Sequence, residues 1–441
     1  MNSREAAYRI IEEVEVHDAY LNLTLPRYLN QFTEQDARFI TELVSGVYRN
    51  RSFLDFAIAT EAKRDLEKVD PPLRDILRIG AYQVLFMRTE NYAAVSETVN
   101  LVSLTRLASA RGFVNATLRK LCEHDLKHYQ ELIEVSSDNV WEKLALLYSH
   151  PLWIVKAAAE ALFSNQTEVE ALLKRNNEVP SVTLVSRAGI FKDGDSSLFS
   201  PYAMRIQENP FRHPLVLEKK AQVQDEGSQL VAQILGYFPI EGTDTSWLDL
   251  CSGPGGKAML LKQFAVGRNA KLTAVELHPH RAELVEDALR DIDGDSSVEI
   301  ADGRDSKFAT GNFDRVLVDA PCLGLGALRR RAESRWRKKA SDLTDLVPLQ
   351  KALLENALKA VRPGGVVGYV TCSWHLAESD YLIADILKTH SDIEIQDINH
   401  GSMAVPHLKR ADDLLSSDKF LRLWPHKHDT DGMFMAVLKR H

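Results

Sequence analysis

The chain has 441 residues, a formal net charge of −8 and four cysteines. This length exceeds one ordinary hydrophobic core, so we expect two or three domains. No stretch has the continuous apolar length needed to cross a bilayer and the N-terminus carries no export signal, so a soluble cytoplasmic protein is expected. The acidic balance argues against general nucleic-acid binding, so any basic surface for such a partner must be local.

The first part of the chain is predicted to be helical. Apolar residues recur at helical spacing from Ser3 to about His128, and Asp70-Pro71-Pro72 is a typical helix start. We therefore expect an all-α domain over residues 1–135. Between residues 136 and 223 helical segments give way to short apolar runs, which indicates linker helices and a small α+β subdomain.

The remainder, residues 224–441, alternates between strand-like and helix-like segments. Helical stretches separate the β-rich apolar runs, which cover residues 247–251, 271–277, 298–301, 313–320 and 366–372. This alternation predicts right-handed βαβ crossovers and a doubly wound, mostly parallel α/β sheet of the Rossmann-like class. Such sheets bind ligands beyond the carboxyl ends of their strands, so functional side chains are expected there.

A compact glycine turn ends the first predicted strand, and its sequence is Cys251-Ser252-Gly253-Pro254-Gly255-Gly256-Lys257. It has neither the phosphate-loop spacing nor the dinucleotide fingerprint. The turn instead suits a nucleoside without a pyrophosphate, such as S-adenosylmethionine. A plain strand-to-helix turn is the alternative, but it does not explain three glycines together with Pro254 and Lys257. We therefore expect residues 251–257 to bind S-adenosylmethionine.

Polar side chains near the other strand ends are expected to complete this cofactor site. Glu276 ends the second strand and is placed to accept hydrogen bonds from ribose hydroxyls. Asp302 follows the third strand and is placed to accept one from the adenine amino group. Taken alone, each would equally suit a helix cap or a solvated loop. Arg281 and Asp319 are the further cofactor-binding candidates.

Three of the cysteines are expected to share one cleft. Cys251, Cys322 and Cys372 follow strands one, four and five, which are adjacent in a doubly wound sheet. Cys122 lies in an amphipathic helical segment and is interpreted as a core residue. No zinc-ligand spacing is present, so no metal site is expected. A redox pair is a weaker alternative, because no CxxC motif or redox cofactor supports it.

The two strand ends Asp319-Ala320-Pro321-Cys322 and Thr371-Cys372-Ser373 suit a demanding methyl transfer. Carbon 5 of a pyrimidine is too weak a nucleophile to take a methyl group directly, but a thiolate that adds to carbon 6 activates it. The reaction also needs a proton acceptor and an acid near ring nitrogen 3, and Asp319 is placed for the latter role. These residues alone leave open whether Cys322 or Cys372 attacks.

A local basic run follows the fourth strand, with the sequence Arg329-Arg330-Arg331-Ala332-Glu333-Ser334-Arg335-Trp336-Arg337-Lys338-Lys339. Its cations are expected to contact phosphates, and its tryptophan to stack on a splayed base. RNA contacts are therefore predicted for Arg329, Arg330, Arg331, Arg335, Trp336 and Arg337. A solvated charged loop is the alternative.

Together these motifs resemble the NOL1/NOP2/Sun family of RNA cytosine-5 methyltransferases over nearly the whole chain. Gln224-Asp225-Glu226-Gly227-Ser228 is similar to the family's entry motif, and the glycine loop, Asp302 and both cysteine segments match further motifs. The resemblance implies that Cys372 is the nucleophile and that Cys322 assists release of the methylated base. Two segments depart from the family pattern, Glu378-Ser379 from Glu-Asn and Gly432-Met433-Phe434 from Gly-Phe-Phe.

The N-terminal region is similar to NusB-like RNA-binding domains in residues 39–47, 77–83 and 112–119. This combination resembles the RsmB (Fmu/Sun) type, and it implies a cytoplasmic enzyme acting on 16S ribosomal RNA, unassembled or partly assembled. A transfer RNA cytosine-5 methyltransferase is one alternative, disfavoured by the NusB-like region. A non-catalytic RNA-binding assembly factor is another, disfavoured by Cys372, Asp319 and the glycine loop.

Overall fold

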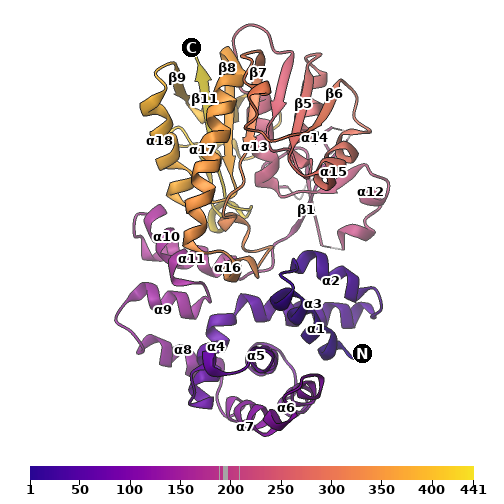
Figure 1. Cartoon of the computed structure of the whole chain (residues 1–441), viewed down its shortest axis with the longest axis vertical. Coiled ribbons are helices and arrows are strands. Elements are labelled where there is room, and N and C mark those ends of the chain that lie inside the picture. The colour runs from indigo at the N-terminus through magenta and orange to yellow at the C-terminus, as the bar shows by residue number, and fades with distance from the viewer. Residues whose placement is uncertain (188, 192–196, 208) are drawn as a thin grey trace. The chain divides into compact units, whose positions relative to one another are not determined.

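A computed structural model describes residues 1–187, 189–191, 197–207 and 209–441. The chain divides into two compact units (Figure 1). The first unit comprises residues 1–178 and 330–337, and the second comprises residues 179–329 and 338–441. The sequence predicts three domains, whereas here the linker helices belong to the first unit and the small sheet to the second. Among the described residues, no helix has both the length and the apolar character to span a bilayer.

The first unit is helical, as the sequence predicted. Its helices are α1 Ser3–Val16, α2 Leu21–Leu29, α3 Glu34–Arg49, α4 Arg51–Ala62, α5 Pro71–Phe86, α6 Asn91–Asn100, α7 Arg111–Leu121, α8 Leu126–Glu134, α9 Val140–Leu147, α10 Leu152–Ala161, α11 Gln166–Asn176 and the short α16 Ser334–Arg337. Apolar side chains at helical spacing, such as Ile10, Ile11 and Val14 on α1, are buried in one core. The predicted start of α5 is confirmed, with Asp70 before it and Pro71 as its first residue.

A small antiparallel sheet opens the second unit. Its strands lie in the order β2-β1-β3 and are β1 Val182–Ser186, β2 Ala203–Ile206 and β3 Ala221–Val223. The short helix α12 Pro214–Leu217 lies between β2 and β3 in the chain. Helix α13, Glu226–Tyr237, follows and leads into the main sheet.

The main sheet has the order β10-β11-β8-β7-β4-β5-β6, with β9 paired to β11. Its strands are β4 Ser246–Asp249, β5 Lys271–Glu276, β6 Ser296–Ile300, β7 Phe313–Asp319, β8 Val361–Thr371, β9 Ile393–Gln396, β10 Leu421–Leu423 and β11 Met433–Arg440. Strands β4 to β8 are parallel, whereas β11 runs antiparallel to β8. The predicted doubly wound α/β class is confirmed.

Helices cover both faces of this sheet (Figure 1). Apolar residues of α13, α14 (Gly256–Val266), α15 (Pro279–Leu289) and α19 (Ile398–Ala404) form one core with it. Those of α17 (Leu343–Ala360) and α18 (Asp380–Thr389) form the core on the opposite face. The short helix α20, Pro425–His428, precedes β11. Because both faces are covered, the strand ends are the edges at which loops can present polar groups.

Candidate active site

Strands β4, β7 and β8 are neighbours and parallel, so their carboxyl ends meet at one edge. The glycine loop follows β4, Asp319 ends β7, and Cys372 directly follows β8. The predicted adjacency of these three strands is therefore confirmed. It brings side chains far apart in the sequence to one place.

The two cysteines at these strand ends lie side by side. Cys322 Sγ is 3.4 Å from Cys372 Sγ. The hydrogen bond from the Cys322 thiol lowers the pKa of Cys372, and the positive charge of Lys257 acts in the same direction against burial and Asp319. The same contact, together with burial, raises the pKa of Cys322 well above its ordinary value. The thiolate is therefore favoured on Cys372, which makes it the better nucleophile of the pair.

A buried glutamate and a glutamine hold the backbone on both sides of Cys322. Glu378 is fully buried, and its Oε1 accepts a hydrogen bond of 2.9 Å from the Leu323 N–H. Gln350 Nε2 donates to Pro321 O at 2.8 Å and to the same Glu378 oxygen at 2.9 Å. Sequence reasoning noted Glu378 only as part of a motif and missed Gln350, because no local pattern links α17 to the Cys322 turn.

Two glycines allow the loop after Cys322 to pack against Cys372. Gly326 N–H donates to Cys372 O, and Gly432 N–H donates to Gly326 O, both at 2.9 Å. A Cβ atom on Gly326 would lie 1.9 Å from Gly432 O, a distance that no side chain can adopt. The Gly432-Met433 segment that opens β11 therefore fixes the position of this loop.

A cavity of about 260 Å³ lies at the same edge of the sheet. The glycine loop, Gln224, Ser228, Asp249 and Asp319 contribute to its lining. Asp249 is fully buried, and its Oδ2 has no hydrogen-bond partner among the described residues. Burial, followed by the charge of Asp319, raises the pKa of Asp249 to about 8. An orphaned buried acceptor in a polar cavity suits a ligand that brings a donor or a positive charge.

Lys257 connects the glycine loop to β7. Its Nζ lies 2.8 Å from Asp319 Oδ2, and both side chains are largely buried. The contact with Asp319 raises the pKa of Lys257 against the opposing effect of burial. The ammonium is therefore held next to the cysteine pair, where it favours negative charge.

Glu276 and Arg281 hold the glycine loop from the β5 side. Glu276 Oε2 accepts from Gly253 N–H at 3.1 Å, and Arg281 Nη2 donates to Gly253 O at 2.6 Å. A Cβ atom on Gly253 would lie 2.2 Å from Glu276 Oε2, so a side chain here would displace the carboxylate that holds the loop. Asp302 pairs with Arg304 at 2.6 Å. Glu276 and Arg281 contact the glycine loop, and neither they nor Asp302 are among the residues that line the cavity.

The basic run requires a correction, because most of its side chains are occupied within the fold. Arg335 is fully buried and donates to Ser149 O at 3.1 Å, Asn177 Oδ1 at 2.7 Å and Asn176 O at 3.1 Å. Trp336 Nε1 donates to Tyr48 O at 2.8 Å and packs against the core of the first unit. Neither side chain is available for the phosphate and base contacts that the sequence predicted.

Two further arginines of the run have internal partners. Arg329 is buried and donates to Asp429 Oδ1 at 3.0 Å. Arg337 donates to the carbonyl groups of Val14, at 3.0 Å, and Ala19. Arg330 is half-buried, and Arg331 has an exposed side chain. Among the arginines of the described residues 329–337, Arg331 alone is fully exposed. It is therefore the one arginine of this run that we retain in the expected RNA surface, because structural contacts hold the others.

A mainly parallel sheet with an antiparallel β11, a glycine turn after its first parallel strand and a cavity at that edge defines the class of Rossmann-like methyltransferases. Residues 239–439 match the family described as 16S rRNA methyltransferase RsmB/F, and residues 1–123 match the NusB family. The chain belongs to the RsmB/F methyltransferase family and carries a NusB-type N-terminal region.

Similar proteins match along nearly the whole chain. "Putative methyltransferase Rv1407" of Mycobacterium tuberculosis is 41% identical, over 99% of this chain and 96% of that protein. "Ribosomal RNA small subunit methyltransferase B" of Photorhabdus laumondii is 27% identical, over 93% of this chain and 96% of that protein. The crystal structure of PH0851 has a TM-score of 0.74 at 20% identity and covers 99% of this chain and 98% of its own, which supports the fold.

Proposed function

We propose that this methyltransferase transfers a methyl group from S-adenosylmethionine to carbon 5 of a cytosine in 16S ribosomal RNA. The observation that carries the proposal is the 3.4 Å contact between Cys322 and Cys372, beside Asp319 and the cavity. Family membership and the names of full-length relatives support RNA as the substrate. The four free cysteines fit a reducing cytoplasmic setting.

The residues of the cavity fit S-adenosylmethionine. All residues of the loop from Cys251 to Lys257 except Gly255 line the cavity, and a side chain at Gly256 would crowd Gln224, which also lines it. Asp249 offers a buried oxygen without a partner among the described residues, which suits the ammonium or the sulfonium. We assign the ribose hydroxyls to Glu276, with Arg281 orienting the loop. When bound, the cofactor supplies an electrophilic methyl group, which carbon 5 accepts.

Cys372 begins the proposed reaction. Its thiolate adds to carbon 6 of the cytosine, and the electron pair of the ring double bond becomes available at carbon 5. Ring nitrogen 3 takes up a proton during addition and returns it on elimination. The Lys257 ammonium, whose Nζ lies 2.8 Å from Asp319 Oδ2, is placed to supply this proton through the Asp319 carboxylate and to recover it by the same route. The lowered pKa of Cys372 increases the thiolate fraction at neutral pH.

Release reverses the addition once carbon 5 carries the methyl group. Loss of the carbon 5 proton to a base returns the electron pair to the ring double bond, and the bond between Cys372 Sγ and carbon 6 breaks. We assign assistance in this step to Cys322, because its Sγ lies beside the leaving sulfur. The clamp formed by Glu378 and Gln350 holds Cys322 in that position.

Two single substitutions test this assignment. Cys372→Ala should abolish carbon 5 methylation, a loss of about four orders of magnitude or more, and should form no covalent complex with RNA. Cys322→Ala should instead accumulate a protein–RNA adduct that resists denaturing electrophoresis. The measurement combines methyl transfer to 16S ribosomal RNA with gel detection of the adduct.

The cofactor affinity of both variants, measured by calorimetry, is the control for an intact site. Methylation of carbon 5 by Cys372→Ala would overturn the mechanism. Absence of both methylation and adduct from the wild-type protein, with intact cofactor binding, would favour a non-catalytic RNA-binding factor.

A further inference from the structure

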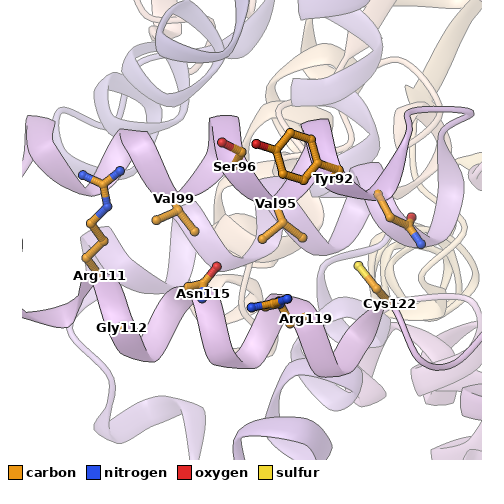
Figure 2. Close-up of a pocket in the computed structure, with 10 residues that line it drawn as sticks. Tyr92, Val95, Ser96, Val99, Arg111, Gly112, Asn115, Arg119 and Cys122 are labelled. Atoms are coloured by element: carbon orange, nitrogen blue, oxygen red, sulfur yellow. The ribbon is translucent and has the colours of Figure 1, made fainter.

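The first unit contains a large groove that the proposed chemistry does not use. Helices α6 and α7 pack side by side, and a cavity of about 710 Å³ opens between their outer faces (Figure 2). Its lining comes entirely from these helices and the residue after α7. The groove is therefore formed by one pair of packed helices within the first unit.

The two helices line the groove with different chemistry. Arg111, Asn115 and Arg119 are four residues apart on α7, so they form one polar stripe that spans about 12 Å along the helix axis. On α6, Val95 and Val99 provide an apolar floor (Figure 2). The groove thus offers cations on one side and an apolar surface on the other.

Tyr92 adds an exposed aromatic ring at the groove. Its side chain is 87% exposed, although burying an aromatic ring of this size normally stabilises a protein. A solvent-exposed ring beside an apolar floor is suited to stacking against a planar ligand. Tyr92 is therefore a candidate contact for a base rather than a core residue.

The charge of the groove favours an anionic partner. No aspartate or glutamate occurs among the described residues that line it. Within the same described part of the chain, neither Arg111 nor Arg119 forms an ion pair with a carboxylate, and Arg111 Nη2 donates to Asn100 Oδ1 at 2.7 Å. This bond orients the Arg111 guanidinium and leaves its other N–H groups for a ligand. The protein as a whole carries a net charge of −8, so attraction of an anionic partner depends on local basic surfaces such as this one.

We infer that the groove between α6 and α7 binds single-stranded RNA. The guanidinium groups of Arg111 and Arg119 contact phosphates, the Tyr92 ring stacks on a base, and Asn115 lies between the two arginines to hydrogen-bond a base edge or a ribose. Cations along a backbone path combined with a stacking platform are the chemistry that single-stranded nucleic acid requires. The inference rests on the proposed function only in taking RNA as the ligand, because binding here requires no methyl transfer.

Gly112 provides a sharp test of the charge argument. It lies in the groove near the start of α7, and a Cβ atom added there meets no atom within 4 Å. Gly112→Glu adds a carboxylate at a helix N-terminus, where negative charge is tolerated, and replaces glycine with a better helix former. The protein should therefore keep its stability while its affinity for RNA falls. Gly112→Lys should raise the affinity, and Gly112→Ala should leave it unchanged.

The binding assay uses the full-length protein and a fluorescent, unstructured RNA oligonucleotide, followed by anisotropy over a range of salt concentrations. We expect the Kd of Tyr92→Ala to rise about tenfold, and Tyr92→Phe to restore binding, because stacking needs the ring rather than the hydroxyl. The Arg111→Ala and Arg119→Ala double variant should reduce the slope of log Kd against log salt by about 1.4, or 0.7 for each lost phosphate contact.

Matched variants outside the groove separate a local effect from a general one. Phe163 is 94% exposed, so Phe163→Ala controls for loss of an exposed ring. Arg38→Ala removes an exposed arginine of α3, whose side chain is 78% exposed and pairs with Glu34. Both controls should bind RNA as the wild type does. Unchanged affinity and salt slope in the Tyr92, Gly112 and double-arginine variants would overturn the inference and leave a protein segment as the competing occupant.

Failure of this inference and failure of the proposed function give different results. If RNA binds through the groove but no adduct forms at Cys372, the groove assignment stands and the catalytic proposal fails. If the groove variants bind RNA normally and Cys322→Ala traps the adduct, the catalytic proposal stands and the groove assignment fails.

Discussion

The sheet edge that carries the proposed active site in the second unit, called the catalytic edge below, and the groove in the first unit use polar groups in opposite ways. At the catalytic edge, Asp249 is fully buried with its pKa raised to about 8, and Cys372 has a lowered pKa beside Cys322. In the groove, Tyr92 and Arg119 are exposed to solvent. Catalysis requires groups whose pKa values are shifted by burial and by nearby charges, whereas binding of an RNA strand requires side chains that are exposed to solvent. The comparison teaches that the chemistry we propose for the second unit and the RNA binding we propose for the first make different demands on the exposure of polar groups.

The basic run of residues 329–339 shows why exposure decides whether an arginine has a structural role or a binding role. Its arginines match those of the groove in residue type, yet Arg335 is fully buried and bonded to three groups of the first unit. The two Nη atoms of this buried guanidinium donate to carbonyl oxygens, while its Nε has no hydrogen-bond partner among the described residues, so the group is committed to the fold and cannot meet a phosphate. The sequence therefore shows arginines in both the basic run and the groove, but only their burial in the structure distinguishes a structural role from the proposed binding role.

Among the predictions that test this comparison, we expect the largest effect, a loss of stability, from replacing Arg335. Arg335→Ala leaves Ser149 O, Asn176 O and Asn177 Oδ1 without their donor, so the first unit should lose about 3 kcal/mol of stability. Urea denaturation, followed by circular dichroism, measures this loss. The exposed neighbour Arg331 is the matched control, and Arg331→Ala should change stability by less than about 0.5 kcal/mol. A stable Arg335→Ala protein with weakened RNA binding would return this residue to the RNA surface.

A smaller effect is expected at the clamp around Cys322. Gln350→Ala removes hydrogen bonds to Pro321 O and Glu378 Oε1, so Cys322 should assist release less well. We expect product release to slow about thirtyfold, a loss of about 2 kcal/mol that accords with two missing hydrogen bonds. The readout is a lower kcat together with a lower KM for RNA, because the covalent adduct accumulates when a step after its formation limits the rate.

Two variants sharpen the interpretation of the clamp. Glu378→Gln keeps an oxygen that can accept from the Leu323 N–H, so it should retain part of the activity. Lys351→Ala, next to Gln350 on α17 and paired with Asp385, should behave as the wild type. A uniform loss of stability without adduct accumulation would assign Gln350 to folding instead.

The smallest effect concerns Asp249 and pH. A cationic ligand favours the ionised carboxylate, so binding should lower its pKa from about 8 and release a proton below that pH. Affinity for S-adenosylmethionine should therefore rise about fivefold from pH 7 to pH 8 and level off above pH 9. Calorimetric titrations of wild type and Asp249→Asn provide the test, and the difference between the two profiles isolates this carboxyl. Parallel profiles would show that Asp249 does not titrate with binding.

Local patterns in the sequence were sufficient to predict the fold class. Three features carried this prediction: the alternation of strands and helices, the glycine turn, and the cysteines at two strand ends. Each of them is encoded by residues that lie close together in the chain. Strand adjacency then followed from the general handedness of βαβ units. These two kinds of information are enough to place the Cys322 and Cys372 segments at one edge of the sheet.

The tertiary structure decided the features that depend on distant residues. Residues 330–337 pack with the first unit because their partners, such as Tyr48, Ser149 and Asn177, lie more than 150 positions earlier in the chain. Gln350 bonds Pro321, the residue before Cys322, and Gly326 bonds Gly432 through contacts of the same kind. No periodicity records such contacts, since they depend on how elements pack. The sequence by itself determined the fold class and the strand ends at which we propose the chemistry, whereas packing alone decided which of its charged side chains remain exposed.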